Sequence, residues 1–224
     1  TNVPYKEKHG STAFLLGSEY LIIRRRLRRL RLSAKARQFP PRKILIAVGG
    51  NDRHGLALTL ADAFLEMSQL QSFRTPQLRV VINQGNPHRK ALIKKLSQLR
   101  NDSALLSQQA DLGDAYLWSD LCINGGGLTK YEAAYMGVPS VVLSQTDEQA
   151  RETVQFASRG LALDLGLAKD ATVASLALGL RKIINHSELL HTMSRQCETF
   201  FPDDPTLQTA QACLTQLAGL VGNK

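Results

Sequence analysis

Short apolar runs alternate with helical patterns along most of this 224-residue chain. Such runs are typical of strands that are buried on both faces of a parallel sheet. Strands and helices that alternate at this spacing favour right-handed crossovers between neighbouring strands. The sequence therefore predicts an α/β fold, a doubly wound, Rossmann-like parallel sheet of about six strands with extra helices at both ends. The predicted strands are residues 43–48, 78–82, 104–107, 121–123, 140–143 and 161–163.

The length and composition fit one large domain with attached segments. An apolar content of 43% is enough for a proper core. We divide the chain into residues 1–42, the tail of a missing N-terminal domain plus a basic linker helix, residues 43–198, the Rossmann-like domain, and residues 199–224, a C-terminal helix. The chain begins at Thr1 without methionine and its first strong strand comes only near Ile44, so we expect a piece of a longer protein.

A helical pattern near the N-terminus carries most of the net positive charge. Tyr20, Ile23, Leu27 and Leu30 recur at helical spacing after Ser18, a candidate N-cap, which predicts an amphipathic helix toward residue 36. Residues 24–37 hold eight of the 28 basic residues, and the other 20 nearly balance the 19 acidic residues. The net charge of +9 is therefore local.

Several interpretations of this basic segment, residues 24–37, stay open. It is either a solvated face or a contact with an acidic partner, a membrane surface or a polyphosphate-bearing substrate. Nucleic acid is not expected as a partner, because no aromatic residues are interleaved with the arginines and no nucleic-acid-binding motif accompanies them.

The cysteines indicate a reducing compartment. Cys122, Cys197 and Cys213 are odd in number and far apart, with no C-x-x-C pair, which favours free thiols over a disulfide or a metal site. Residues 1–14 do not resemble a signal peptide, and no apolar run approaches the roughly 20 residues of a membrane span. We expect a cytoplasmic protein, with peripheral membrane contact as one alternative for the basic segment.

Several familiar catalytic and cofactor motifs are missing. The chain has no G-x-x-x-x-G-K-[ST] loop, and its first turn reads GGNDRHG rather than G-x-G-x-x-G, with no acid after the second strand, which argues against NAD. Neither G-x-S-x-G nor H-E-x-x-H occurs, and the histidines are scattered. We therefore expect no metal and no cofactor.

A glycine turn between a strand and a helix is the best candidate binding site. Gly125, Gly126 and Gly127 follow the run at residues 121–123, and glycines there let backbone N–H groups approach an anion at the start of the helix. Glu132, further along that helix, suits vicinal hydroxyls better than phosphate. Phosphate plus diol indicates a nucleotide, although the glycines can also serve tight packing of the helix on the strand.

Other polar turns follow neighbouring strands. Ligands bind doubly wound sheets beyond the carboxyl ends of the strands, where we also expect the turn at Gly49 and Gly50. Asp52 and His54, at the same edge, are weak candidates for acid/base chemistry, and an exposed loop histidine is the plainer interpretation of His54. No catalytic residue is assigned beyond these two.

The run INGGGLTKYEAAYMGVPSVVLSQTDEQ, together with the GGND turn, resembles the C-terminal nucleotide-sugar-binding domain of two-domain GT-B proteins. The PseG/SpsG type is most similar: UDP-sugar hydrolases of pseudaminic acid biosynthesis and their spore-coat polysaccharide relatives. MurG-type glycosyltransferases are more distant. The stretch LLGSEYLIIRRRL also resembles the segment that joins the two domains in the PseG group, and the resemblance covers residues 15–165.

The resemblance implies a role for each matching residue. Gly125, Gly126, Gly127, Leu128 and Thr129 would hold the phosphates of a UDP-sugar, and Glu132 would accept hydrogen bonds from the ribose. The residues that would face the sugar or the diphosphate are Gly49, Gly50, Asn51, Asp147, Glu148 and Gln149. Two departures from the family pattern are a missing serine at position 127 or 128 and a glutamate at position 148, both of which weaken phosphate binding.

Two classes of function follow from the resemblance. In the first, the chain is part of an enzyme in which water (hydrolase) or an acceptor hydroxyl (glycosyltransferase) attacks the anomeric carbon and UDP leaves. The PseG group carries its catalytic base in the N-terminal domain, so this piece would bind nucleotide yet turn over little alone. In the second, the chain is a binding module without catalysis.

Overall fold

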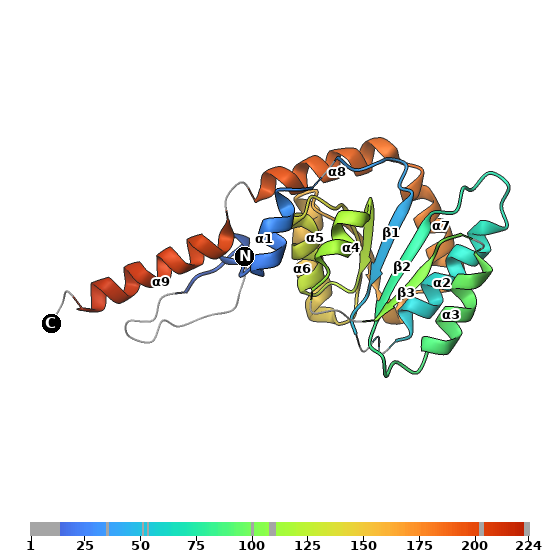
Figure 1. Cartoon of the computed structure of the whole chain (residues 1–224), viewed down its shortest axis with the longest axis horizontal. Helices are drawn as coiled ribbons and strands as arrows, with labels where there is room; N and C mark the ends of the chain where they lie inside the picture. Colours follow the sequence, from blue (N-terminus) through green and yellow to red (C-terminus); the bar gives the residue numbers. More distant parts are fainter. Residues whose placement is uncertain are drawn as a thin grey trace.

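The computed structural model describes residues 14–34, 36–50, 52, 54–99, 101–107, 111–201 and 204–221. Within them a single parallel sheet has the strand order β3-β2-β1-β4-β5-β6 (Figure 1). The prediction of a six-stranded, doubly wound sheet is confirmed. The strands are β1 (Lys43–Ala47), β2 (Gln77–Ile82), β3 (Ala104–Ser107), β4 (Leu121–Asn124), β5 (Ser140–Ser144) and β6 (Leu163–Leu167).

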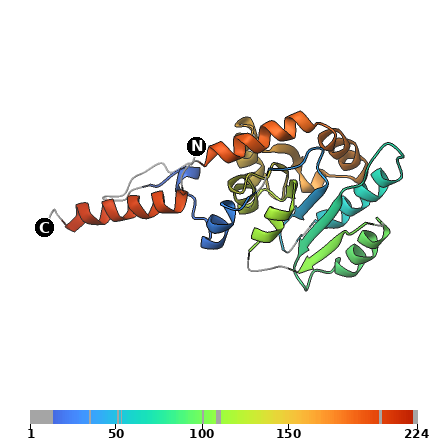
Figure 2. The same ribbon diagram turned by 45° about the horizontal axis from the view of Figure 1, so that its top comes forward.

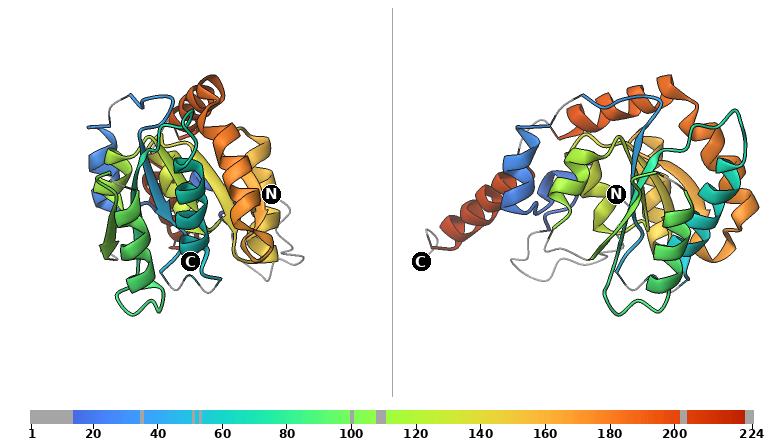
Figure 3. Two further views of the ribbon diagram at one scale, coloured as in Figure 1. Left: turned by 90° about the vertical axis from the view of Figure 1, so that its right-hand side faces the viewer. Right: turned by 45° about the vertical axis from the view of Figure 1, so that its right-hand side comes forward.

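Helices cover both faces of the sheet (Figure 3). One face carries α2 (Leu56–Ser68), α3 (Arg89–Gln98) and α7 (Val173–Ile184), and the other carries α1 (Arg25–Arg31), α4 (Gly113–Trp118), α5 (Leu128–Tyr135) and α6 (Asp147–Ser158). Successive side chains of a strand point to opposite faces, so Ile44 and Ile46 pack under the first group while Leu45 and Ala47 pack under the second. The apolar run of β1 thus contributes to two cores.

A helix covers the edge of the sheet where the strands begin, whereas turns lie at the edge where the strands end. Helix α8 (Ser187–Phe200) lies across the edge where the strands begin, and its Ser194 hydroxyl donates to the carbonyl of Gly137 just before β5, at 2.9 Å. At the other edge, β1 and β4 end side by side, with Ala47 paired to Asn124. The glycine turn therefore opens from the centre of the sheet at its carboxyl edge.

The predicted sixth strand was displaced. Residues 161–163 were expected to form it, whereas β6 is Leu163–Leu167. Gly160 has φ +70° and the amide of Leu161 donates to the carbonyl of Phe156, so residues 160 and 161 end α6 rather than pair with β5. A short 3-10 helix, η2 (Ala168–Asp170), follows the strand.

The predicted N-terminal helix toward residue 36 was wrong. A 3-10 turn, η1 (Ser18–Tyr20), is followed by extended backbone, and α1 covers only Arg25–Arg31, so the basic helix 24–37 does not form as one element. Two threonines of α9 (Pro205–Val221) form hydrogen bonds with the backbone of this stretch. The Thr206 hydroxyl accepts from the amide of Ile23 and donates to its carbonyl, and the Thr209 hydroxyl donates to the carbonyl of Tyr20 at 2.8 Å. These long-range bonds override the helical spacing.

Internal partners account for several cations of the basic segment. Arg26 pairs with Asp111 and Asp114 at 2.6 and 2.7 Å, and Arg28 pairs with Asp204 at 2.6 Å. Arg37 donates to the backbone carbonyls of Tyr116, Ser119 and Met136. Lys35 lies outside the described residues. These contacts tie the segment to α4 and to the start of α9, and contact with an external acidic partner or a membrane surface stays a prediction.

Helix α9 extends away from the sheet and its covering helices (Figures 1 and 2). Its exposed apolar side chains include Leu207, Leu214 and Leu217. Helix α8 continues to Phe200, beyond the boundary expected at residue 198, while the division into three segments stays a prediction. Among the described residues, no helix combines the length and the apolar character that a membrane crossing needs.

Candidate functional site

The first two glycines of the turn after β4 are required by sterics. A Cβ at Gly125 would lie 2.5 Å from the backbone oxygen of Val48, at the end of β1. Gly126 has φ +81°, a conformation that L side chains rarely adopt, and a Cβ there would lie 3.0 Å from the hydroxyl of Ser144. The glycines therefore let the chain pass between the ends of β1 and β5. Tight packing, the alternative interpretation, explains Gly125 and Gly126.

Of the four amides of residues 126–129, one has an acceptor within the described part of the chain and three do not. The Gly126 amide donates to Oδ1 of Asn124 at 3.1 Å. Within the described part of the chain, no hydrogen-bond acceptor lies opposite the amides of Gly127, Leu128 and Thr129. These are the first amides of α5, where a helix leaves N–H groups unpaired and presents the positive end of its dipole. The geometry of these three amides suits an anion, and the phosphate-binding role of residues 125–129 stays a prediction.

Glu132 lies one turn further along α5 and is half-buried. Its Oε2 accepts a hydrogen bond from the hydroxyl of Tyr116, on α4, at 3.1 Å. Burial raises the pKa of the Glu132 carboxyl, while the Tyr116 bond and the charge of Arg24 act in the opposite direction. No hydrogen-bond donor within the described residues reaches its Oε1. One carboxylate oxygen is thus oriented by the protein and the other is available.

The turn after β5 brings a glutamine to the glycines. Thr146 caps α6 by accepting from the amide of Gln149 at 3.2 Å, and Oε1 of Gln149 accepts from the amide of Gln145 at 2.9 Å. A Cβ at Gly126 would lie 3.3 Å from the Cβ of Gln149, so the two residues are neighbours. The Nε2 of Gln145 donates to the carbonyl of Val48 at 3.2 Å, which links β5 to β1 across the turn.

The two acidic residues before Gln149 are exposed to solvent, and one of them forms an ion pair with η2. The Asp147 side chain is 71% exposed and pairs with Lys169 of η2 at 3.6 Å. Glu148 is exposed. The structure therefore brings Gln149 to the glycine turn and ties Asp147 to η2; the roles predicted for Asp147, Glu148 and Gln149 stay predictions.

The turn after β1 lies at the same edge. Gly49 has φ +105° and is exposed, and a Cβ at Gly50 would lie 2.5 Å from the side chain of Asn83, which follows β2. Asn51 lies outside the described residues. Gly49 is therefore open to solvent at this edge, whereas Gly50 packs against Asn83, and the contact of both glycines with a sugar stays a prediction.

Asp52 serves as a helix cap. Its two carboxylate oxygens accept from the amides of Leu56 and Ala57 at 2.8 and 2.9 Å, at the start of α2. Burial raises the pKa of Asp52, while those backbone bonds and the nearby His88 and His54 act against the rise. A carboxylate engaged in this way stabilises α2, and acid/base roles for Asp52 and the exposed His54 stay predictions.

The sequence analysis missed Lys130, which lies behind the turn. The side chain is fully buried, and its Nζ donates to the carbonyl of Gly126 at 2.8 Å and pairs with Oε2 of Glu152 on α6 at 3.2 Å. Burial lowers the pKa of Lys130, although Glu152 favours its charged form. Helical spacing gives the missed signal, because Lys130 shares a face of α5 with the buried Ala133 and Ala134.

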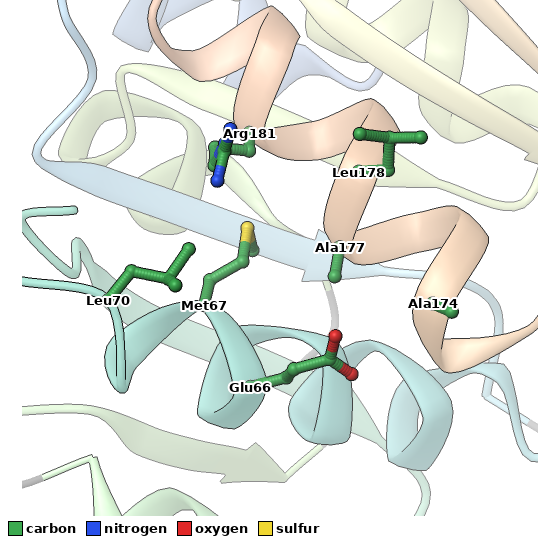
Figure 4. Close-up of a pocket in the computed structure, with 7 residues that line it drawn as sticks. All are labelled: Glu66, Met67, Leu70, Ala174, Ala177, Leu178 and Arg181. Atoms are coloured by element: carbon green, nitrogen blue, oxygen red, sulfur yellow. The ribbon is translucent and has the colours of Figure 1, made fainter. Parts of the chain in front are cut away.

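A groove lies away from this edge, on one face of the sheet. Between α2 and α7 an open groove of about 230 Å³ is lined mainly by apolar side chains, with Glu66 and Arg181 at its borders (Figure 4). It contains none of the predicted site residues, and it offers no group suited to phosphate except Arg181. The glycine turn therefore remains the candidate site. The lining residues are Glu66, Met67, Leu70, Ala174, Ala177, Leu178 and Arg181.

Comparison with known proteins places this geometry in context. No family model matches the chain. The spore coat polysaccharide biosynthesis protein SpsG of Bacillus subtilis (strain 168) is 28% identical to it over 176 residues, which are 79% of this chain and 50% of SpsG. The chain thus spans half the length of that relative.

Solved structures share the fold. MurG of Acinetobacter baumannii aligns with a TM-score of 0.61 at 21% identity, over 83% of this chain and 52% of the MurG chain. UDP-GlcNAc 2-epimerase of Neisseria meningitidis, solved with UDP-GlcNAc bound, aligns with a TM-score of 0.55 at 17% identity, over 86% of this chain and 48% of the epimerase. The chain is therefore similar to SpsG in sequence over most of its length, and it has the fold of about half of a GT-B protein such as MurG.

Proposed function

We propose that the chain is the nucleotide-diphosphosugar-binding part of an enzyme that acts at the anomeric carbon of a UDP-sugar and releases UDP. One observation carries the proposal. Among the described residues, the amides of residues 127–129 have no protein acceptor, and one turn further along α5 the Glu132 carboxylate has one oxygen oriented by Tyr116 and the other available. The amides suit a diphosphate, and Oε1 of Glu132 suits the ribose diol.

Three supports come from outside the site. SpsG is named for spore coat polysaccharide biosynthesis, and the Neisseria epimerase was solved with UDP-GlcNAc in place. A transferase of Psychromonas ingrahamii that is 25% identical over 63% of this chain has UDP-N-acetylglucosamine in its name. UDP is therefore the first nucleotide to test.

Two reactions fit this site. Water attacks the anomeric carbon in an SpsG/PseG-like hydrolase, and an acceptor hydroxyl attacks it in a MurG-like glycosyltransferase. Asp52 does not offer a free base, because both of its carboxylate oxygens cap α2. We propose that the base comes from the half of such proteins that this chain does not match. A non-catalytic binding module is the remaining alternative.

Calorimetric titration of the chain with UDP, ADP and NAD tests the proposal. We expect clear binding of UDP, weaker binding of ADP, which keeps the diphosphate and ribose but not the uracil, and no preference for NAD. Equal or tighter binding of NAD, or no binding of UDP, would refute it. A coupled assay of UDP release from UDP-GlcNAc separates the remaining options, because rapid release by this chain alone contradicts a base outside it.

A further inference from the structure

Lys130 is an unusual residue for the inside of a protein. Its side chain has no exposed surface, and lysines are rarely fully buried unless a partner compensates the charge. The partner, Glu152, keeps 55% of its own side chain exposed, so solvent weakens the pair on one side. Burial therefore costs free energy that a methionine of similar length would not cost.

The ammonium contacts the functional turn directly. It donates to the carbonyl of Gly126, the residue with φ +81°, at 2.8 Å. That residue's amide is held by Asn124, so both polar groups of the Gly126 backbone are fixed from inside the protein. The Gly126 peptide is thus held on both sides, and in the part of the chain that the structure describes the next three amides have no protein acceptor.

Two acidic groups and one aromatic ring lie near the ammonium. Glu152 on α6 and, at longer range, Asp164 on β6 face it, and the ring of Tyr131 has its centroid 5.1 Å from the Nζ. The hydrogen bond to Gly126 leaves this charge one residue before the amides that would meet a diphosphate. A positive charge this close, in a medium of lower dielectric than water, acts on an anion more strongly than a surface lysine does.

We propose that Lys130 is a positioning residue for the diphosphate: it fixes the Gly126 carbonyl inward, keeps the amides of Gly127, Leu128 and Thr129 directed to the ligand, and adds a positive charge behind them. It does not touch the ligand. The inference rests on the proposed binding of a nucleoside diphosphate at this turn.

The alternative is a purely structural tie between α5 and α6. Under that alternative neither Lys130→Met nor Glu152→Gln changes the ligand preference, because each variant only breaks the tie between the two helices, and any effect is on the melting temperature. Under our proposal the two variants differ. Lys130→Met removes the charge from the turn, whereas Glu152→Gln leaves the charge and removes its counter-ion.

Calorimetry with UDP, uridine and inorganic pyrophosphate, alongside thermal unfolding, separates the two. We expect Lys130→Met to weaken the binding of UDP and of pyrophosphate at least about tenfold, because the positive charge behind the three amides is lost and the Gly126 carbonyl is no longer held. The binding of uridine should not change. Glu152→Gln should bind UDP as tightly as the wild type or more tightly. The proposal would be overturned if the ratio of the Kd values for UDP and uridine were unchanged in Lys130→Met. It would also be overturned if both variants weakened UDP binding equally.

Two outcomes keep the inference separate from the proposed function. If the wild type binds pyrophosphate but not UDP, the function fails while Lys130 is still tested with pyrophosphate; if it binds neither, both fail. If Lys130→Met does not fold, the affinities of Glu152→Gln test the inference. A loss of UDP affinity without a loss of uridine affinity in that variant would contradict a lysine charge that acts on the diphosphate.

Discussion

The substitution Glu132→Gln should separate binding from stability. In the wild type the hydroxyl of Tyr116 donates to Oε2 of Glu132 at 3.1 Å. Glutamine has the same shape and its amide oxygen can accept the same bond, but it lacks the negative charge and the second acceptor oxygen. A hydrogen bond to a charged group contributes about 1.5–3 kcal/mol. Loss of that contact to the ribose should therefore raise the Kd for UDP about 10- to 150-fold.

Stability should change in the opposite direction. Burial raises the pKa of Glu132 in the folded chain. A carboxyl with a raised pKa stabilises the fold through its protonated form, fully so below the ordinary glutamate pKa of about 4.3, and this contribution is lost as the pH rises through the folded value. Near neutral pH the ionised side chain therefore costs free energy, and glutamine avoids that cost. Glu132→Gln should melt at the same or a higher temperature than the wild type at neutral pH, and the gap should close toward about pH 4.

The assay is calorimetry with UDP and 2′-deoxy-UDP, paired with thermal unfolding at both pH values. The wild type should prefer UDP to its deoxy analogue, and Glu132→Gln should lose most of that preference. Glu66→Gln, an exposed glutamate beside the α2–α7 groove, is the matched control and should change neither affinity nor melting temperature. UDP affinity within about twofold of the wild type, or a melting temperature that falls along with affinity, would refute the reasoning.

Two further predictions concern packing and thiol reactivity. Gly125→Ala places a Cβ 2.5 Å from the backbone oxygen of Val48. Because that oxygen belongs to buried backbone, we expect the free energy of unfolding, measured with urea, to fall by about 1–3 kcal/mol. A decrease below about 0.5 kcal/mol would contradict the close approach. Burial raises the pKa of the Cys122 and Cys197 thiols to about 12, whereas Cys213 is exposed; a thiol reagent should therefore modify Cys213 rapidly in the folded chain and reach the other two only after unfolding, and equal rates for all three would be the contrary result.

The sheet could be predicted because buried parallel strands carry their signal locally. Each run such as residues 43–48 is apolar on both faces, and the glycines after residue 123 mark the turn regardless of what lies elsewhere. The N-terminal helix failed for the opposite reason. Ile23 is held by Thr206, a residue 183 positions away, and no local pattern contains that bond.

The candidate site shows the same division. The glycine turn and Glu132 follow from the sequence, but the partners that orient them do not. Tyr116, which donates to Glu132, reads only as part of a short helix, and Lys130, which holds Gly126, reads as a solvated cation until its helical face is considered. The sequence also does not show that the carboxylate of Asp52 accepts hydrogen bonds from the first amides of α2.

The most direct measurement follows the backbone amides themselves. Nitrogen-15 spectra of the labelled chain, recorded with UDP and then with uridine, report which N–H groups meet the phosphates. The amides of Gly127, Leu128 and Thr129 should shift strongly with UDP and little with uridine, while that of Gly126, already bonded to Asn124, should shift less. If UDP leaves those three amides in place and moves resonances elsewhere, the glycine turn is not the diphosphate site.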